Sequence, residues 1–235
     1  MIFKISYVIP VFNEKNTIKK AITDVLRLPI KKEIIVIDNN SYDGTKEILI
    51  NFKRKNKNKN IKLILRKKNL GGAESVMEGI RLSKGKYIYI QYADLEYDEK
   101  KSLSMYNLAE REKLDVVLGS RVKNRLKKNT WIEIIVSRPA FAATFVTTKL
   151  FNFFYNKKFT DIIGARLYKR EKIIKLPFDY NDASFDFAFV SRMAKMGLEM
   201  TEVNVRYKFR KFGTSNMRWF HLFNAIIAMV KVKLF

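Results

Sequence analysis

The sequence has no cysteine and a single histidine, His221, and both absences restrict its chemistry. Without cysteine the chain forms no disulfide, no thiolate nucleophile and no cysteine-ligated zinc site. One histidine cannot make a histidine cluster, so a metal site must be built from carboxylates. Carboxylate oxygens favour hard divalent ions, and the expected cofactor is therefore Mg²⁺ or Mn²⁺.

Long apolar runs are also missing. The N-terminal apolar run is short and no small-residue cleavage site follows it, so it is not a secretory signal. The most apolar segment, residues 219–235, is interrupted by His221, Asn224, Lys231 and Lys233, and no stretch reaches the roughly 20 apolar residues of a membrane span. We expect a cytoplasmic protein, peripherally associated with the inner face of the cytoplasmic membrane.

Acidic side chains are scarce relative to basic ones: 23 Asp and Glu face 47 Lys and Arg, for a net charge of +24. Such a surface attracts phosphates, and an anionic membrane surface is an expected partner. The alternative is that the excess of Lys, Asn and Ile reflects codon composition alone. No helix-turn-helix, RNA-recognition or zinc-finger motif accompanies the charge, so we expect no nucleic acid partner.

Apolar runs of strand length alternate with helical patterns in the first half of the chain. This alternation predicts an α/β fold with a Rossmann-like, mostly parallel sheet flanked by helices. Ligands of such sheets bind beyond the carboxyl ends of the strands, where Asp38 and Asp94 are predicted to lie. The predicted strands are residues 5–11, 33–38, 61–65 and 86–91, and the predicted helices are 17–28, 46–53 and 73–83.

The second half is less regular, with a short strand predicted at 116–118, a helix at 186–196 and a strand at 198–207. Residues 131–154 and 219–235 combine apolar, aromatic and basic side chains, as amphipathic helices at membrane interfaces do. The alternative for both segments is a buried helix or a dimer interface, and the sequence does not specify the oligomeric state.

Seven segments, in order, resemble known enzymes. The first four are similar to motifs of the family 2 glycosyltransferases, which have the GT-A fold: VIPVFNE (8–14), IDNNSYDGT (37–45), NLGGAESVMEGI (69–80) and YADLEYD (92–98). Three more resemble the subgroup that loads sugars onto polyprenyl phosphates, such as dolichyl-phosphate mannosyl- and glucosyltransferases: GSR (119–121), DIIGARLYKR (161–170) and VNVRYKFRKFGTSNM (203–217). The resemblance implies a GT-A domain over residues 1–217 and an interfacial apolar and basic helix over residues 218–235.

The resemblance also implies a binding site for a nucleotide-sugar donor. Pro10, Phe12 and Glu14 would line the nucleoside pocket, with Glu14 accepting from ribose hydroxyls, although Glu14 can instead favour the dipole of the next helix. Asp38 would accept from an N–H of uracil or guanine. Asp43 is better explained as a helix cap, and Gly44 beside it tolerates positive φ.

Two further segments complete the implied donor site. Backbone N–H groups between Asn69 and Gly72 would meet a phosphate or the sugar, although a glycine pair before a helix is also ordinary loop chemistry. Arg206 and Arg210 would close over the diphosphate. The alternative for this last segment is an ordinary strand with a basic face.

The resemblance places the catalytic metal on YADLEYD. Asp94 and Glu96 would be the metal ligands, and the ion would neutralise the diphosphate leaving group. The family usually has D-x-D here, and Tyr92 stands where the first Asp is expected. The alternative for this acidic loop is a solvated turn without a metal. Tyr92, together with Asn216 in the last segment, would then indicate a non-catalytic homologue.

Arginines mark the implied acceptor side. Arg121, as a catalytic residue, and Arg138 would hold the phosphate of the polyprenyl lipid. A lipid phosphate is already ionised and needs no strong base. If a base is used, Asp161 is the candidate, although capping or pairing with Arg166 explains it better. A second hypothesis is that the enzyme transfers a hexose from the donor to a saccharide hydroxyl instead of a lipid phosphate. That reaction would need such a base.

Overall fold

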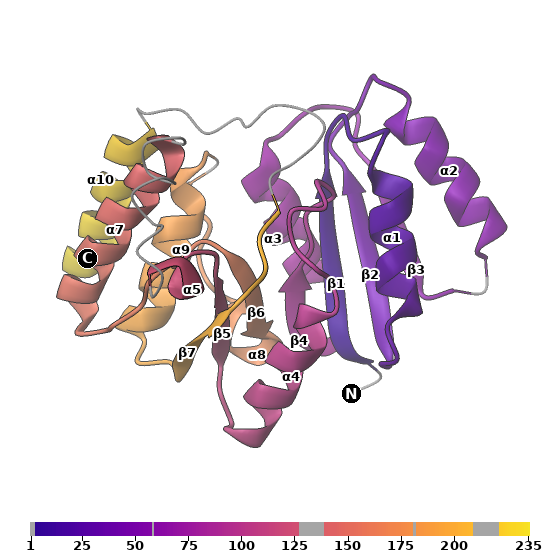
Figure 1. Cartoon of the computed structure of the whole chain (residues 1–235). Coiled ribbons are helices and arrows are strands. Elements are labelled where there is room, and N and C mark those ends of the chain that lie inside the picture. Colours follow the sequence, from indigo (N-terminus) through magenta and orange to yellow (C-terminus); the bar gives the residue numbers. More distant parts are fainter. Residues whose placement is uncertain (1–2, 58, 127–138, 181, 209–220) are drawn as a thin grey trace.

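The structure, a computed structural model, describes residues 3–57, 59–126, 139–180, 182–208 and 221–235 (Figure 1). One seven-stranded sheet with the order β3-β2-β1-β4-β6-β5-β7 forms its centre. Among the strands of the described residues, only β6 runs antiparallel to its neighbours, so the predicted mostly parallel α/β sheet is confirmed. The strands are β1 Phe3–Val11, β2 Lys32–Asp38, β3 Ile61–Leu65, β4 Gly85–Ile90, β5 Val116–Ser120, β6 Ala165–Lys169 and β7 Met200–Asn204.

Helices cover both faces of the sheet. Two separate apolar clusters fill the spaces beneath them, because the buried strands present branched side chains to both sides. One cluster joins the sheet to α1 Ile18–Arg27, α2 Thr45–Lys55 and α4 Lys101–Arg111. The other joins it to α3 Gly72–Leu82, α7 Pro139–Tyr155, α8 Arg170–Ile173, α9 Ser184–Lys195 and α10 His221–Leu234. The short α5, Lys123–Leu126, follows β5.

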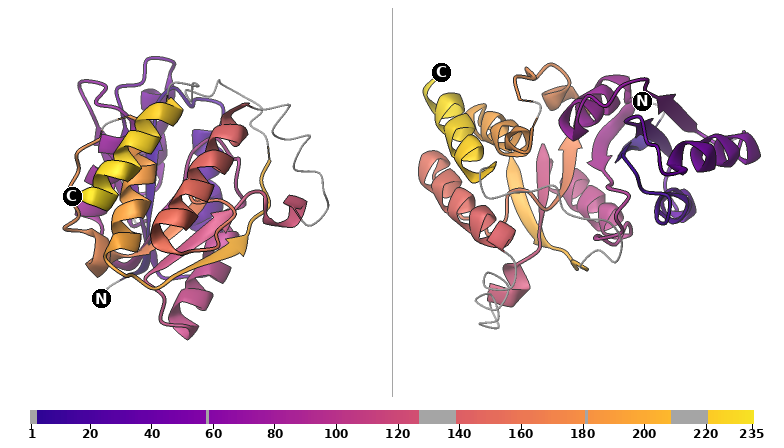
Figure 2. Two further views of the ribbon diagram at one scale, coloured as in Figure 1. Left: turned by 90° about the vertical axis from the view of Figure 1, so that its left-hand side faces the viewer. Right: turned by 90° about the horizontal axis from the view of Figure 1, so that it is seen from above.

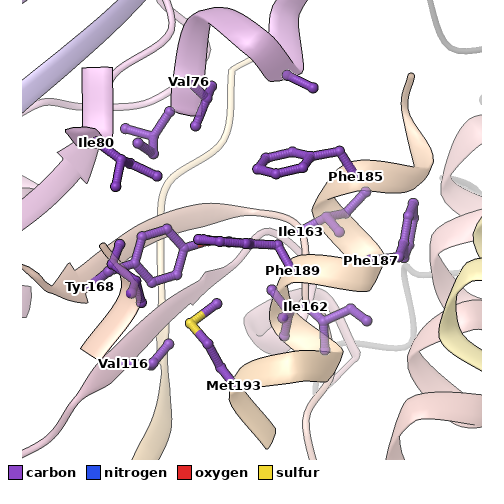
Figure 3. Packing of buried hydrophobic residues seen from close by; sticks show 14 of the residues in the cluster. Val76, Ile80, Val116, Ile162, Ile163, Tyr168, Phe185, Phe187, Phe189 and Met193 are labelled. Carbon is purple, nitrogen blue, oxygen red and sulfur yellow. The ribbon is translucent and has the colours of Figure 1, made fainter. Parts of the chain in front are cut away.

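Aromatic rings of α9 and β6 meet within the second cluster (Figure 3). Phe185 and Phe189, one turn apart on α9, stack with ring centroids 5.1 Å apart, and Phe189 meets Tyr168 of β6 edge to face. Such pairs add about 0.5–1.5 kcal/mol to the burial of their area. They fix α9 against the sheet, and the first turn of α9 carries Asp186 of the site described below.

The C-terminal helix α10 packs on α9 and α7 (Figure 2). Ala225, Ala228 and Met229 are fully buried, so small residues let α10 approach α9 closely. Lys233 Nζ donates to the Phe154 carbonyl at 2.8 Å and ties the end of α10 to α7. The predicted C-terminal helix is thus observed from His221 onward. In the described ranges, no helix has the length and apolar content to cross a bilayer.

Candidate active site

Most of the predicted site residues come together at one edge of the sheet. The carboxyl ends of β1, β2, β4, β5 and β7 meet there, and the antiparallel β6 begins there. Across this edge the strand order sets out, in turn, Asp38 at the end of β2, Glu14 after β1, Asp94 after β4, Arg166 on β6 and Arg121 after β5. Residues far apart in sequence therefore share one surface.

The loops after β1 and β2 are braced against each other. Asn13, with φ 56°, accepts from Tyr42 N at 3.1 Å and its own N–H donates to Ser41 Oγ at 2.9 Å. The rings of Phe12 and Tyr42 meet edge to face with centroids 5.8 Å apart. Pro10 lies within β1 and is buried. These contacts hold the predicted nucleoside pocket in one shape.

Glu14 serves the helix that follows it. Its carboxylate accepts from Thr17 Oγ1 at 2.8 Å, and its carbonyl accepts from Ile18 N at 2.9 Å at the start of α1. These contacts place Glu14 at the N-terminus of α1, where its charge can favour the helix dipole, and ribose binding by Glu14 stays a prediction. Asp43 accepts from Thr45 N at 3.0 Å at the start of α2, which confirms its structural role, and Gly44 has φ 98°.

Asp38 is completely buried at the end of β2. One carboxylate oxygen accepts from Ser41 N at 3.2 Å, and the other, Oδ1, has no hydrogen-bond partner in the described part of the chain. An unpaired buried acceptor costs about 1–3 kcal/mol, and more when it is charged. This geometry fits a residue whose partner is a ligand N–H group.

Asn39 holds the loop that contains Asn69 and Gly72. Asn39 Nδ2 donates to Asn69 Oδ1 at 2.6 Å, and Asn39 Oδ1 accepts from Leu70 N at 2.9 Å and from Arg66 at 3.2 Å. Asn69 therefore acts here through its side chain as a brace. A Cβ added at Gly72 would meet nothing within 4 Å, so this backbone is open to a ligand. Sequence reasoning missed Arg66, which no motif marks.

The acidic loop after β4 is compact. Asp94 Oδ1 accepts from Glu96 N at 3.1 Å, and Leu95 between them has φ 58°. The segment after β7 crosses this loop, because Lys208 N donates to the Glu96 carbonyl at 2.8 Å. Burial, aided by Glu96, raises the pKa of Tyr207 to about 12. No group of three or more metal-binding side chains exists among the described residues, so Asp94 and Glu96 form at most a two-carboxylate site.

Tyr92 is joined to a buried ion pair. Arg166, with a side chain 4% exposed, pairs with Asp186 of α9 through Nη1. Its Nη2 donates to the Tyr92 hydroxyl at 2.7 Å, and its guanidinium lies 5.6 Å from the centroid of the Tyr92 ring. The predicted pairing of Arg166 with Asp161 is therefore wrong, because β6 carries the Arg166 side chain toward α9.

Asp161 pairs instead with Arg121. Arg121 Nε and Nη2 donate to its two oxygens at 2.6 and 3.0 Å, in the bidentate geometry that arginine favours, and the Arg121 backbone N–H adds a third bond at 3.1 Å. The Asp161 side chain is 1% exposed. The pair fixes the Arg121 guanidinium at the end of β5, 5.8 Å from the Tyr207 ring centroid.

Three arginines complete the predicted set. Arg206 is exposed, two residues beyond β7, at the same edge of the sheet. Arg138 and Arg210 lie outside the described residues.

A mostly parallel seven-stranded sheet with helices on both faces, and an acidic loop at its carboxyl edge, is the architecture of the GT-A glycosyltransferases. Residues 6–176 match the family model described as Glycosyl transferase family 2, and the chain belongs to this family. The glycosyltransferase class predicted from the sequence motifs is thereby confirmed.

Among curated proteins, an uncharacterized protein of Methanocaldococcus jannaschii is 30% identical over 207 residues, covering 85% of this chain and 87% of that protein. A dolichyl-phosphate beta-glucosyltransferase of Dictyostelium discoideum is 30% identical over 129 residues, covering 50% of this chain and 39% of that enzyme. A poly-beta-1,6-N-acetyl-D-glucosamine synthase of Staphylococcus epidermidis is 32% identical over 124 residues, covering 52% of this chain and 29% of that enzyme. The chain thus spans well under half of these two enzymes.

Solved structures share the fold at low identity. A mannosyltransferase from Pyrobaculum calidifontis, in complex with GDP-Man and Mn²⁺, superposes with a TM-score of 0.65 at 16% identity, over 91% of this chain and 59% of that one. Glucosyl-3-phosphoglycerate synthase from Mycobacterium tuberculosis, with Mn²⁺, UDP-Glc and phosphoglyceric acid, gives 0.68 at 18% identity, over 98% of this chain and 80% of that one.

Proposed function

We propose that the chain transfers a hexose, with inversion, from a UDP- or GDP-linked donor to a polyprenyl phosphate at the inner face of the cytoplasmic membrane. The observation that carries this proposal is the order of groups along the carboxyl edge of the sheet. The carboxylate of Asp38, the carboxylates of Asp94 and Glu96 and the fixed guanidinium of Arg121 follow one another from β2 to β5. A nucleoside, a diphosphate and an acceptor phosphate need these groups in this order.

The donor end rests on Asp38. Its Oδ1, which has no partner among the described residues, accepts from an N–H of uracil or guanine, and this removes the cost of leaving a buried carboxylate oxygen unpaired. Phe12, Glu14 and the buried Pro10 form the wall after β1, and the open backbone at Gly72 approaches the ligand from α3. The comparison structures with GDP-Man and UDP-Glc support both kinds of donor.

The metal end rests on Asp94 and Glu96. Two carboxylates together with diphosphate oxygens satisfy Mg²⁺ or Mn²⁺, which binds through one or two protein carboxylates plus phosphate. When bound, the ion neutralises negative charge on the departing nucleoside diphosphate. Asp94 and Glu96 would hold the ion, and Arg206 and Arg210, which follow β7 in the sequence, would add positive charge for the diphosphate. Mn²⁺ in both comparison structures supports this assignment.

The acceptor end rests on Arg121. Asp161 holds its guanidinium in one orientation, so Arg121 presents positive charge to an acceptor phosphate without an entropic cost of ordering at the moment of reaction. Arg138 adds a second cation. The resemblance of residues 161–170 to lipid-phosphate enzymes and the dolichyl-phosphate beta-glucosyltransferase relative support a lipid phosphate as acceptor.

The membrane contact rests on α7 and α10. Together they expose Phe153 (82%) and Ile227 (52%), with Lys149, Lys231 and Lys233 exposed beside them. Apolar side chains with lysines around them suit a bilayer surface with anionic head groups. In this proposal α10 is both part of the folded domain and its interfacial helix.

The second candidate is transfer to a saccharide hydroxyl, which the poly-beta-1,6-N-acetyl-D-glucosamine synthase relative favours. Such a reaction needs a general base near the acceptor. The base predicted for it, Asp161, accepts hydrogen bonds from Arg121 on both oxygens, so it would have to break one of these bonds to take a proton from a hydroxyl. The lipid phosphate, which needs no base, is therefore the better supported acceptor.

The test is transfer of labelled hexose from a panel of UDP- and GDP-sugars in a membrane extract, with wild type and Asp94→Ala, with and without Mg²⁺ or Mn²⁺. We expect label in the organic phase from one donor, lost in Asp94→Ala and without metal. Label only in water-soluble glycan would replace this proposal with the second candidate. A folded protein that transfers from no donor would mean a non-catalytic homologue.

A further inference from the structure

Tyr92 stands at a position of the acidic loop where a carboxylate is expected, yet its hydroxyl is held in place. Arg166 Nη2 lies 2.7 Å from Tyr92 Oη, and Asp186 holds Arg166 from the other side. Tyr92 itself is half-buried and its ring packs against the aromatic core beneath α9.

The direction of this hydrogen bond determines what Tyr92 can do. A guanidinium has only donors, so the Tyr92 oxygen must be the acceptor. The phenolic proton is then left for a different acceptor. Within the described ranges, Arg166 is the one hydrogen-bond partner of the Tyr92 hydroxyl. Donation from a cation also polarises the phenol, which makes its O–H a stronger donor.

The position of Tyr92 indicates which acceptor it meets. Asp38 ends β2, Tyr92 follows β4, and β1 lies between them, so the two residues are two strand spacings, about 10 Å, apart across the sheet. Tyr92 also lies two residues before Asp94, so a nucleotide whose base binds Asp38 and whose diphosphate reaches Asp94 extends toward Tyr92. Diphosphate oxygens are acceptors only, which matches the donor that Tyr92 offers.

We propose that the Tyr92 hydroxyl donates a hydrogen bond to a diphosphate oxygen of the donor, and that Arg166 and Asp186 are positioning residues that aim it. An aspartate at this position would only accept and would add a negative charge. The chain has thus exchanged a group that attracts metal for one that binds the nucleotide directly. This inference rests on the proposed nucleotide-sugar donor.

The test is equilibrium binding of UDP and GDP to purified protein, with uridine and guanosine as phosphate-free probes, in Mg²⁺ and again in EDTA. For Tyr92→Phe we expect about 10- to 100-fold weaker binding of the diphosphate that wild type prefers, with the nucleoside unchanged. The loss persists in EDTA, because Tyr92 contacts the ligand and not the metal. Tyr92→Asp should bind the diphosphate less well in EDTA and respond more strongly to Mg²⁺.

Tyr89→Phe is the matched control, since Tyr89 lies on β4 and its buried hydroxyl has no partner among the described residues. Its diphosphate affinity should equal that of wild type. Asp186→Asn, which loosens Arg166 without touching Tyr92, should show part of the Tyr92→Phe loss. Equal diphosphate affinity in wild type and Tyr92→Phe would overturn the inference about Tyr92 and leave the proposed function unchanged. A wild-type protein that binds neither diphosphate would overturn the proposed function with it.

Discussion

Replacing Asp38 by Asn should make the protein more stable and its nucleotide binding weaker. Asp38 is fully buried, one of its oxygens accepts from Ser41 N, and the other has no partner in the described ranges. The amide oxygen of an asparagine keeps the Ser41 bond, while the charge is removed. The amide N–H₂ then points where the ligand N–H should bind, so donor meets donor.

The two effects have opposite signs and similar sizes. Removing the charge from an unsatisfied buried acceptor should raise the free energy of unfolding by about 1–2 kcal/mol. For a chain of this size that corresponds to about 2–8 °C in Tm. Losing a hydrogen bond to a charged group should weaken nucleotide binding by about 1.5–3 kcal/mol, or roughly 10- to 150-fold.

Thermal unfolding with and without UDP or GDP measures both effects in one experiment. At a ligand concentration 100 times the wild-type Kd, wild type should gain about 2.7 kcal/mol, and a variant binding 30-fold more weakly about 0.9 kcal/mol. Asp43→Asn is the matched control, because hydrogen bonds from Thr45 and Lys15 already occupy both Asp43 oxygens. A ligand-induced shift in Asp38→Asn equal to that of wild type would refute the role of Asp38.

Three further predictions concern stability. Asp161→Ala leaves Arg121 as a buried cation without its partner, and urea unfolding should show a free energy of unfolding lower by about 3–5 kcal/mol. An unchanged urea midpoint would mean that the pair contributes nothing to stability. Gly79→Ala should lower the free energy of unfolding by about 1–3 kcal/mol in the same assay, because the added Cβ would lie 2.2 Å from Val8 Cγ1. No loss would mean that α3 can shift away from the sheet at no cost. Burial alone would raise the pKa of Asp43, but hydrogen bonds outweigh it and lower that pKa, so the contribution of this carboxylate is complete above about pH 4 and disappears as the pH falls further. Acid titration of wild type and Asp43→Asn checks this, and a stability difference that persisted at the lowest pH would contradict it.

The first half of the fold was predictable because its elements are local. Residues 34–37 form an unbroken apolar run between Glu33 and Asp38, and the structure places β2 at Lys32–Asp38. The interior strand β6 was missed, since Ala165–Lys169 is short, carries Arg166 and pairs with β4 and β5, which are distant in sequence. The helix α4 also went unpredicted, because it carries only a weak apolar stripe.

In the site, residues at strand ends were predictable and their partners were not. The place of Asp38 follows from the strand that it ends. The bond between Arg121 and Asp161 joins residues 40 positions apart, and their motifs do not specify it. Nearness in sequence instead favoured Arg166 for Asp161, although β6 directs the Arg166 side chain to Asp186. The packing of α9 against the sheet determines which carboxylate Arg166 meets.

The most direct test of lipid-phosphate transfer uses purified protein, labelled UDP- and GDP-hexoses, Mn²⁺, and anionic vesicles that contain either a polyprenyl phosphate or the matching neutral polyprenol. We expect labelled lipid from one donor with the phosphate and none with the alcohol, because in the proposed reaction Arg121 binds the acceptor phosphate and no base is used to activate a hydroxyl. Equal transfer to the neutral polyprenol, or transfer to added saccharide in vesicles without either lipid, would contradict the account.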